Sequence, residues 1–418
     1  MSVRTHRLTV LIALVLLLNT SLAANATQPS ESPYLSPEIT ISDFNNRESV
    51  PDIAYNHKHN EYFVVWQTDN PYTIRGARIS ATGQVLANFQ INGGPAFQPA
   101  VAYDPVHDRY LVVFIFGDSN SPSKPDLLGR FIPWDGPDPI IKSFPIATWS
   151  TTQIDPDVAY GRAMEEFLVV WANLYTPPTP LPNYISGRRI RAADGSFIGT
   201  GSNMTINHPS QDRNNPRVTY NLARNEYLVV YDNLVDILGT RFTGDLTHDF
   251  GGELKIAGWP DAESNPDAAA CYEADQYFVT WQSDQGSSND AIYGRYINGD
   301  GTPGAVKKID DTTGPEREAS VSCNNAGNQY LIAWQTEYTI LKFGVWARFV
   351  QPDGKMGDPF PVQEPFNQSH RTLPAVAGGK TNYMAVWENE RGNTGFWDIH
   401  GRLISPYAVF TPAVYGQK

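Results

Sequence analysis

Cysteine is nearly absent from this chain of 418 residues, which carries only Cys271 and Cys323 beside eight histidines. Two cysteines without a cluster of histidines make no zinc site, and the histidines lack the spacing of metal ligands. The chain also has no Gly-x-Ser-x-Gly motif and no glycine-rich phosphate loop. The sequence therefore predicts no metal and no cofactor, and no motif in it identifies a catalytic residue.

Basic charge is also scarce, because 31 Lys and Arg face 44 Asp and Glu and give a net charge of −13. This balance argues against nucleic acid or an anionic membrane surface as a general partner. The apolar run from Leu8 to Leu18 is shorter than the ~20 residues that a membrane span needs. We therefore expect no stable membrane insertion, and we expect a monomer.

Residues 1–26 have the pattern of a secretory signal peptide. Arg4 and Arg7 precede the apolar run, and Ser21-Leu22-Ala23 or Ala24-Asn25-Ala26 provides a small-x-small cleavage site. An uncleaved anchor is the alternative. We expect export to a secreted, extracellular or periplasmic location, followed by a polar leader at 27–37 that is disordered. Residues 405–418 are expected to form a C-terminal tail.

What the chain does have is a strand of five apolar residues that occurs seven times. The first copy is Tyr62–Trp66, and the last residues of successive copies are 48 to 60 positions apart by subtraction: Trp66, Phe114, Trp171, Tyr231, Trp281, Trp334 and Trp387. Alternate side chains of a strand point to opposite faces. Because this strand is apolar on both faces, it must be covered on both.

Each repeat has four parts, of which the apolar strand is the second. The first is Pro-x-apolar-small-aromatic, as in Pro51–Tyr55, where a leading proline suits the edge of a sheet. The third is a small residue followed closely by Arg, as in Gly294-Arg295, and the fourth is a short strand that ends in Ile or Val. Turns containing Asp-Gly join several third and fourth parts.

The seventh repeat lacks a fourth part, whereas an unattached one, Ile39–Ile41, precedes the first repeat. If this strand completes the last repeat, the array closes into a ring without an open sheet edge. The sequence therefore predicts an all-β fold over residues 38–404, a seven-bladed β-propeller of four-stranded blades, closed by the N-terminal strand. A solenoid is the alternative, but it would need polar capping repeats, which are missing.

The repeat resembles that of secreted bacterial β-propellers, a group whose members differ in function. Its period exceeds that of WD40 repeats, and it lacks the Asp-boxes of sialidases and the double glycine of kelch repeats. The resemblance covers the architecture and implies no catalytic residue.

Cys271 and Cys323 fall at matching places in adjacent repeats. A disulfide between neighbouring blades is therefore one possibility, and two buried free thiols are the other. The repeated Arg of the third part is interpreted as scaffold, because a residue present in every blade is expected to stack on an aromatic ring or bind a loop carbonyl.

Candidate binding residues lie in the loops that lead into each first part, since these loops should meet at one mouth of the channel. They comprise four arginines, five acids and one histidine: Arg47, Arg213, Arg317, Arg371, Glu48, Asp155, Glu263, Glu316, Glu318 and His370. Converging guanidinium groups would suit a carboxylate or sulfate. The alternative is that each arginine pairs with a nearby acid.

These observations favour an exported, non-catalytic binding protein whose mouth holds a glycan or an extracellular protein. A secreted glycoside hydrolase or polysaccharide lyase with its site at the same face is the alternative, because two of the acids could supply a catalytic pair. A lectin with one site per blade is a third hypothesis.

Overall fold

The computed structural model describes residues 32–117, 126–148, 151–175, 181–199, 204–207, 211–246, 252–258, 261–284, 290–310, 314–339, 342–363, 371–392 and 394–406. All regular elements in these ranges are β-strands, and no helix in them is long and apolar enough to cross a bilayer. The expected signal peptide, residues 27–31 of the expected leader and residues 407–418 of the expected C-terminal tail lie outside the described residues.

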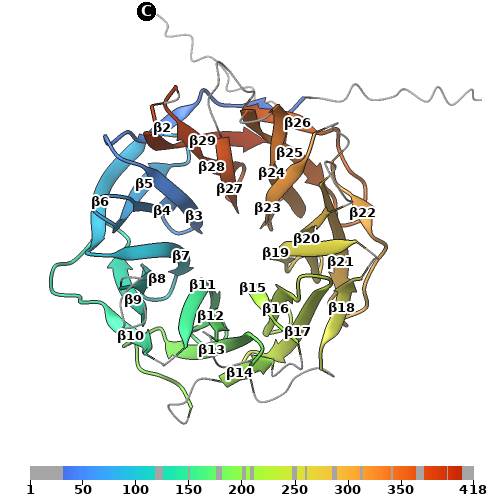
Figure 1. Ribbon diagram of the computed structural model, residues 1–418, viewed down its shortest axis with the longest axis horizontal. Coiled ribbons are helices and arrows are strands. Elements are labelled where there is room, and N and C mark those ends of the chain that lie inside the picture. The colour runs from blue at the N-terminus through green and yellow to red at the C-terminus, as the bar shows by residue number, and fades with distance from the viewer. Residues whose placement is uncertain are drawn as a thin grey trace, which may run out of the picture. The chain divides into compact units, whose positions relative to one another are not determined.

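Seven antiparallel sheets, six of four strands and the last of five, are arranged around one axis (Figure 1), so the predicted seven-bladed β-propeller is confirmed. The first three blades are β3 (Glu48–Asn56) to β6 (Val85–Gly93), β7 (Ala96–Asp104) to β10 (Phe144–Ala147), and β11 (Thr152–Gly161) to β14 (Met204–Asn207). The next three are β15 (Asn214–Asn221) to β18 (Leu254–Ala257), β19 (Ala262–Cys271) to β22 (Lys307–Lys308), and β23 (Glu316–Asn324) to β26 (Phe360–Gln363).

The middle strands of the blades are β4 (Glu61–Thr68), β5 (Thr73–Ser80), β8 (Arg109–Phe116), β9 (Asp126–Pro133), β12 (Glu166–Leu174), β13 (Tyr184–Arg191), β16 (Glu226–Asp232), β17 (Ile237–Thr243), β20 (Gln276–Asp284), β21 (Ala291–Asn298), β24 (Gln329–Thr339) and β25 (Lys342–Val350). The last blade contains β27 (Arg371–Gly378), β28 (Tyr383–Glu390) and β29 (Trp397–Ser405). The axial strands, one in each blade, are β3, β7, β11, β15, β19, β23 and β27 (Figure 1).

The N-terminus closes the ring, as the sequence predicts. Strand β2 (Ile39–Ser42) pairs with β29, with Ile39 opposite Gly401, and so supplies the outer strand of the last blade (Figure 1). Two residues of the segment expected to be disordered are ordered instead, because β1 (Tyr34–Leu35) also pairs with β29. The unpaired edge of β29 is long enough to accept both short strands, one after the other.

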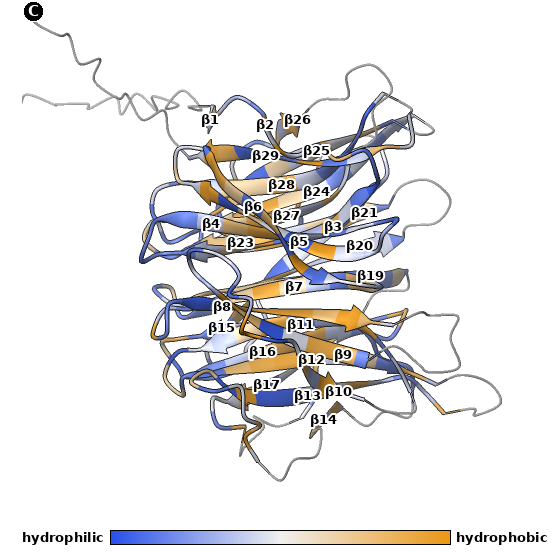
Figure 2. Ribbon diagram, turned by 90° about the vertical axis from the view of Figure 1, so that its left-hand side faces the viewer, coloured by the Kyte–Doolittle hydropathy of each residue, from blue (hydrophilic) through white to orange (hydrophobic). Residues whose placement is uncertain are grey.

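The apolar strands form the cores between blades. Tyr62, Val64 and Trp66 pack against the last blade, whereas Phe63 and Val65 pack against the second. All five are completely buried, and Figure 2 shows that hydrophobic segments run along the strands of the blades. This alternation confirms that each strand is covered on both faces and makes each blade depend on its two neighbours.

The repeated arginines form two sets rather than one. Those that directly follow the small residue donate to a main-chain carbonyl of the preceding blade: Arg130 to Ile91, Arg295 to Ile256, Arg348 to Ile309 and Arg402 to Val362. Those one position later pair with the glutamate that opens the neighbouring strand: Arg78 with Glu61, Arg189 with Glu166 and Arg241 with Glu226. A shift of one residue moves a side chain to the other face, which explains the two roles.

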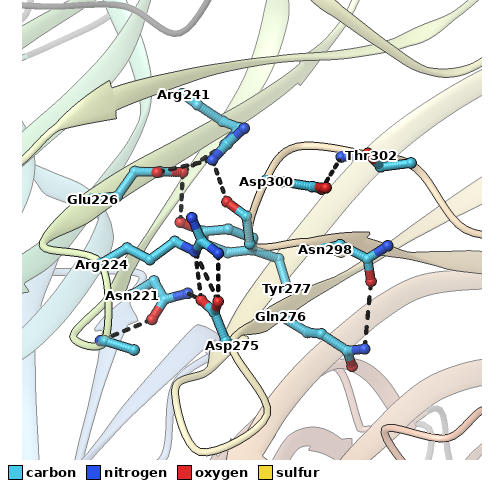
Figure 3. Close-up of polar contacts among 12 residues, drawn as sticks. Asn221, Arg224, Glu226, Arg241, Asp275, Gln276, Tyr277, Asn298, Asp300 and Thr302 are labelled. Atoms are coloured by element: carbon cyan, nitrogen blue, oxygen red, sulfur yellow. Dashed lines mark hydrogen bonds and ion pairs between the residues drawn. The ribbon is translucent and has the colours of Figure 1, made fainter.

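Figure 3 shows one member of the second set at the seam between the fourth and fifth blades. Arg241 Nε lies 2.5 Å from Glu226 Oε1, and the hydroxyl of Tyr277 in the next blade donates to the same oxygen at 2.9 Å. Arg224 and Asp275 add an exposed ion pair at 2.6 Å across this seam. The arginines of the repeat therefore hold blades together, as the scaffold interpretation of the sequence indicates.

Each axial strand carries a bulge next to its proline. The register of pairing shifts at this point in all seven blades, and the residue before the proline has a positive φ: Val50, Gln98, Asp155, Asn215, Asn265, Glu318 (which precedes Ala319) and Leu373. The expectation that the proline opens the strand is corrected here, since the strand begins earlier and the proline occupies the bulge. The bulge redirects the side chains beside the axis.

Candidate functional site

A cavity of about 490 Å³ lies on the axis and is lined by residues of all seven axial strands. Its size is within the range of sites for small molecules or for one unit of a larger ligand. The bulges determine which side chains face the cavity, because six of the seven bulge residues with positive φ line it. Non-glycine residues in this conformation are uncommon and gather at functional sites.

The bulge residues make the cavity mouth polar on one side and apolar on the other. Gln98, Asp155, Asn265 and Glu318 are polar, whereas Val50 and Leu373 are neighbours in the last and first blades and are apolar. Nε2 of Gln98 donates to Asp155 Oδ1 at 2.6 Å, and Nδ2 of Asn265 lies 3.3 Å from Glu318 Oε1. These two pairs leave further carboxylate and amide lone pairs for a ligand.

The seventh bulge residue, Asn215, does not line the cavity. Its Nδ2 donates instead to Oδ2 of Asp232 at 2.8 Å, and the main-chain N–H of Asn265 donates to the same oxygen at 3.1 Å. Asn215 and Asn265 thus share a conformation and a position in the repeat but differ in what their side chains reach.

A second ring of charged groups lies two residues deeper in the axial strands. Asp52, Asp157 and Asp267 each accept a hydrogen bond from a main-chain N–H of the next blade, at 2.7 to 2.8 Å: Val101, Val218 and Val321, respectively. Each aspartate therefore joins two axial strands and also contributes a carboxyl group to the cavity wall. The equivalent position in the fourth blade is Arg217, also in the wall.

Burial raises the pKa of these carboxyl groups. It brings the pKa of Asp52 to about 7 and that of Asp267 to about 6, and it also raises the pKa of Asp157, Asp155 and Glu318. The charge of Arg217 opposes this effect at all five groups, although at Asp52 the like charge of Asp157 has the larger influence. Several carboxyl groups around one cavity thus titrate above their ordinary range, which is typical of functional sites.

Of the sequence-predicted residues, Asp155 and Glu318 line the cavity. Glu48 does not, because it lies beneath Trp66, whose Nε1 donates to Glu48 Oε1 at 2.7 Å, and it is fully buried. Glu263 and Glu316 hold the equivalent places in β19 and β23 and are buried to the same degree. These three glutamates lie before the bulge, where the strand faces the interior of its own blade.

The predicted arginines are distributed over separate ion pairs. Arg213 binds Glu253 at 3.0 Å, and Arg317 binds Asp290 at 2.6 Å. Arg47 lies 4.0 Å from Glu388 and stacks over Trp397. His370 and the side chain of Arg371 lie outside the described residues. The pairs seen here match the alternative in which each arginine neutralises a nearby acid, and none of these three arginines lines the cavity.

Sequence reasoning missed the inner ring of Asp52, Asp157, Arg217 and Asp267. The signal was present, because these residues directly follow the proline of the first part, where other blades have Ala100 or Ala375. A charged residue after that proline departs from the small residue found there in other blades. On a repeated scaffold, positions that differ between blades are the ones that indicate a candidate site.

Solved structures share this fold at low sequence identity. A fungal alcohol oxidase of the AA5 family, in complex with copper, matches with a TM-score of 0.57 and 10% identity, over 90% of this chain and 76% of its own. A protein of unknown function from Dyadobacter fermentans matches with a TM-score of 0.52 and 10% identity, over 90% and 99%. Hydrazine synthase of Kuenenia stuttgartiensis matches with a TM-score of 0.51 and 10% identity, over 85% and 96%.

No protein-family model and no curated protein matches the chain. The structural matches therefore establish a β-propeller without assigning the chain to a functional family. In the ranges that the structure describes, no group of three or more His, Cys, Asp or Glu side chains is placed to hold a metal ion.

The raised pKa values predict that stability falls as pH rises. Burial also raises the pKa of Glu48 and Glu388 to about 7. A carboxyl group whose pKa is raised by folding stabilises the fold fully below its unfolded pKa of about 4, and this contribution is lost as pH rises through the folded value. We therefore expect the melting temperature to be higher at pH 5.5 than at pH 8, by about 5 °C or more.

Calorimetric melting of the wild type and of Glu388→Gln across this range tests the prediction. The neutral amide should raise the melting temperature at pH 8 and reduce the difference between the two pH values. Glu273→Gln at an exposed position is the matched control and should change neither. A wild-type melting temperature that is constant or rises with pH would contradict the account.

Proposed function

We propose that the protein is an exported binding protein that holds one polar unit of its ligand, favouring a glycan, in the axial cavity. The observation that supports this proposal most is that the blades differ from one another at the residues that line the cavity. Equivalent bulge positions hold an amide, a carboxylate or an aliphatic side chain, whereas the positions between blades repeat the same aromatic and arginine contacts. A site for a single ligand needs such differences, and a scaffold does not.

A glycan unit suits the mixed character of the mouth. Sugar hydroxyl groups pair well with carboxylates and amides, which Asp155, Asn265 and Glu318 provide. The C–H groups of a sugar ring would meet Val50 and Leu373 on the other side. A polar side chain of an extracellular protein is the alternative ligand, and a binding screen that includes both classes separates them.

The comparison of Asn265→Gly with Asn215→Gly tests the site. Glycine keeps the positive φ of 51° at both positions, so neither variant is strained. A glycan array followed by calorimetric titration of the mature chain should show binding that Asn265→Gly weakens about tenfold, since the hydrogen bond from the Asn265 amide to a sugar hydroxyl group is lost. Asn215→Gly should bind like the wild type. Equal effects of the two variants, or no ligand on the array, would contradict the proposal.

A secreted polysaccharide-active enzyme is the second candidate, and the pKa of Asp52 supports it. A carboxyl group that is protonated near pH 7 beside carboxylates that ionise earlier is the arrangement of an acid and a base. Reducing ends or unsaturated products released from polysaccharides by the wild type, and lost in Asp52→Asn, would establish this activity. If no product is released from a broad panel of polysaccharides, the enzyme candidate is wrong and the binding function is the one that stands.

Two features support export. Cys271 and Cys323 are bonded to each other, and disulfides persist in oxidising compartments. The N-terminal residues 1–26 have the composition of a signal peptide. Mass spectrometry of the protein recovered from the culture medium or periplasm would show a new N-terminus after Ala23 or Ala26 if the proposal is right, and an intact Met1 in the cell pellet if it is not.

A further inference from the structure

Arg217 is the one basic residue among the described residues that line the axial cavity. The equivalent positions in the other blades hold Asp52, Ala100, Asp157, Asp267, Ser320 and Ala375. The aspartates, and the serine hydroxyl, which accepts a hydrogen bond from Val376 N at 3.3 Å, bind the main chain of the next blade. Arginine has no acceptor group and cannot make that bond, so Arg217 is not explained by the joining of blades.

The guanidinium of Arg217 is largely unsatisfied by the protein. Its one hydrogen bond to a described residue runs from Nη1 to the carbonyl oxygen of the adjacent Pro216 at 2.8 Å. No carboxylate of the described residues lies within 4.0 Å of it, in contrast to Arg189, Arg213 and Arg241, which all have bidentate partners. Since arginine carries five N–H donors, four remain for a ligand or for solvent.

The surrounding charges place this group near the axis. Arg217 interacts electrostatically with Asp155 and Asp157 of the third blade, Asp267 of the fifth and Asp52 of the first. Arg217 belongs to the fourth blade and Asp52 to the first. Because their charges interact across the ring, the side chain of Arg217 must extend toward the middle of the ring. Its free donors therefore face the space that a bound ligand would occupy.

We propose that Arg217 binds the carboxylate of an acidic sugar unit that enters the axial cavity, while the mouth residues bind the hydroxyl groups of that unit. The proposal rests on the function proposed above and narrows its ligand to uronate-type glycans. Guanidinium binds carboxylate through two parallel hydrogen bonds, which a neutral sugar cannot replace. Of the arginines that the sequence indicated, Arg47, Arg213 and Arg317 are engaged elsewhere.

The same geometry predicts how binding depends on pH. The carboxyl groups in the wall around Arg217 are Asp52 on β3, Asp155 and Asp157 on β11, Asp267 on β19 and Glu318 on β23, and neither β7 nor β27 adds one to the described wall. The tyrosines of the wall, Tyr160 and Tyr220, have raised pKa values and stay neutral in this range. When these acids are ionised, they repel a second anion. As the pH falls from 8 to 6, Asp52 becomes largely protonated and Asp267 partly so. A carboxylate ligand should therefore bind more tightly at pH 6.

Calorimetric titration of the mature chain with a tetrasaccharide of galacturonate, and with its carboxyl-reduced counterpart, tests the proposal. At pH 6 we expect Arg217→Met to weaken binding of the uronate about tenfold or more and to leave the carboxyl-reduced sugar unchanged. Arg217→Lys, which keeps the charge but not the paired donors, should lie between. Melting curves show whether each variant is folded.

Wild-type binding measured at pH 6 and pH 8 supplies a test that needs no variant. Tighter binding of the uronate at pH 6, with little change for the reduced sugar, is expected. Preference for the reduced sugar, or an Arg217→Met variant that binds the uronate normally, would overturn the inference while leaving the proposed function intact if Asn265→Gly still weakens binding. Loss of both effects would overturn both.

Discussion

A chain that starts at Asp43 is expected to lose its folded monomeric state, whereas a chain that starts at Ser32 should melt like the mature protein. The shorter chain lacks β1 and β2, which pair with β29 and complete the last blade. Ile41 is 3% exposed and belongs to the core between the last and first blades. Losing a buried isoleucine alone costs about 2–5 kcal/mol, and the exposed edge of β29 adds a template for aggregation.

The closing segment also binds both blades that it joins. The hydroxyl of Ser42 donates to Glu48 Oε1 at 2.7 Å in the first blade, and His400 Nδ1 of the last blade lies 2.5 Å from Glu38 Oε1. Light scattering after size exclusion, with thermal melting, measures the outcome. The result expected is aggregation or a melting temperature lower by more than 10 °C, since the deletion removes several kcal/mol. A monomer that melts unchanged would show that the ring does not depend on this closure.

Reduction of the Cys271–Cys323 disulfide should cost about 4 kcal/mol of unfolding free energy, because the bond closes a loop of about 50 residues in the unfolded chain. The two cysteines lie in β19 and β23, the axial strands of the fifth and sixth blades, with their Cα atoms 5.5 Å apart. The bond thus joins neighbouring blades directly beside the cavity, where Cys323 is part of the wall.

Chemical denaturation of the wild type with and without a reductant measures this effect. The Cys271→Ala/Cys323→Ala double variant should match the reduced protein and should not respond to reductant, which makes it the internal control. Equal denaturation midpoints for the oxidised and reduced wild type would contradict the predicted stabilisation. Because the bond is buried, reduction is best completed in denaturant before refolding.

The ring could be predicted from the sequence because its determinants repeat. Seven copies of one doubly apolar strand require blades that cover each other, and the missing fourth part of the last repeat matches the spare strand at Ile39–Ile41. Repetition supplies seven observations of the same physical pattern. A single such strand would have fitted a buried strand of many other folds.

The residues that line the axial cavity could be predicted only in part, because the bulges change which side chains face the axis. Glu48, Glu263 and Glu316 precede the bulge and turn into their own blades, whereas Asp155 and Glu318 are bulge residues and line the cavity. Simple alternation along the strand cannot distinguish these positions, since a bulge shifts the register by one residue. For the same reason the inner ring, Arg217 included, was not singled out.

The stoichiometry of binding tests the central claim most directly, namely that one axial cavity formed by all seven blades is the ligand site. Calorimetric titration of the mature chain with a glycan selected on the array should give one ligand per chain, and Asn265→Gly and Glu318→Gln should both weaken it. Several equivalent ligands per chain, as a lectin with a site on each blade would show, would contradict the claim. So would a single ligand that binds both variants as tightly as the wild type.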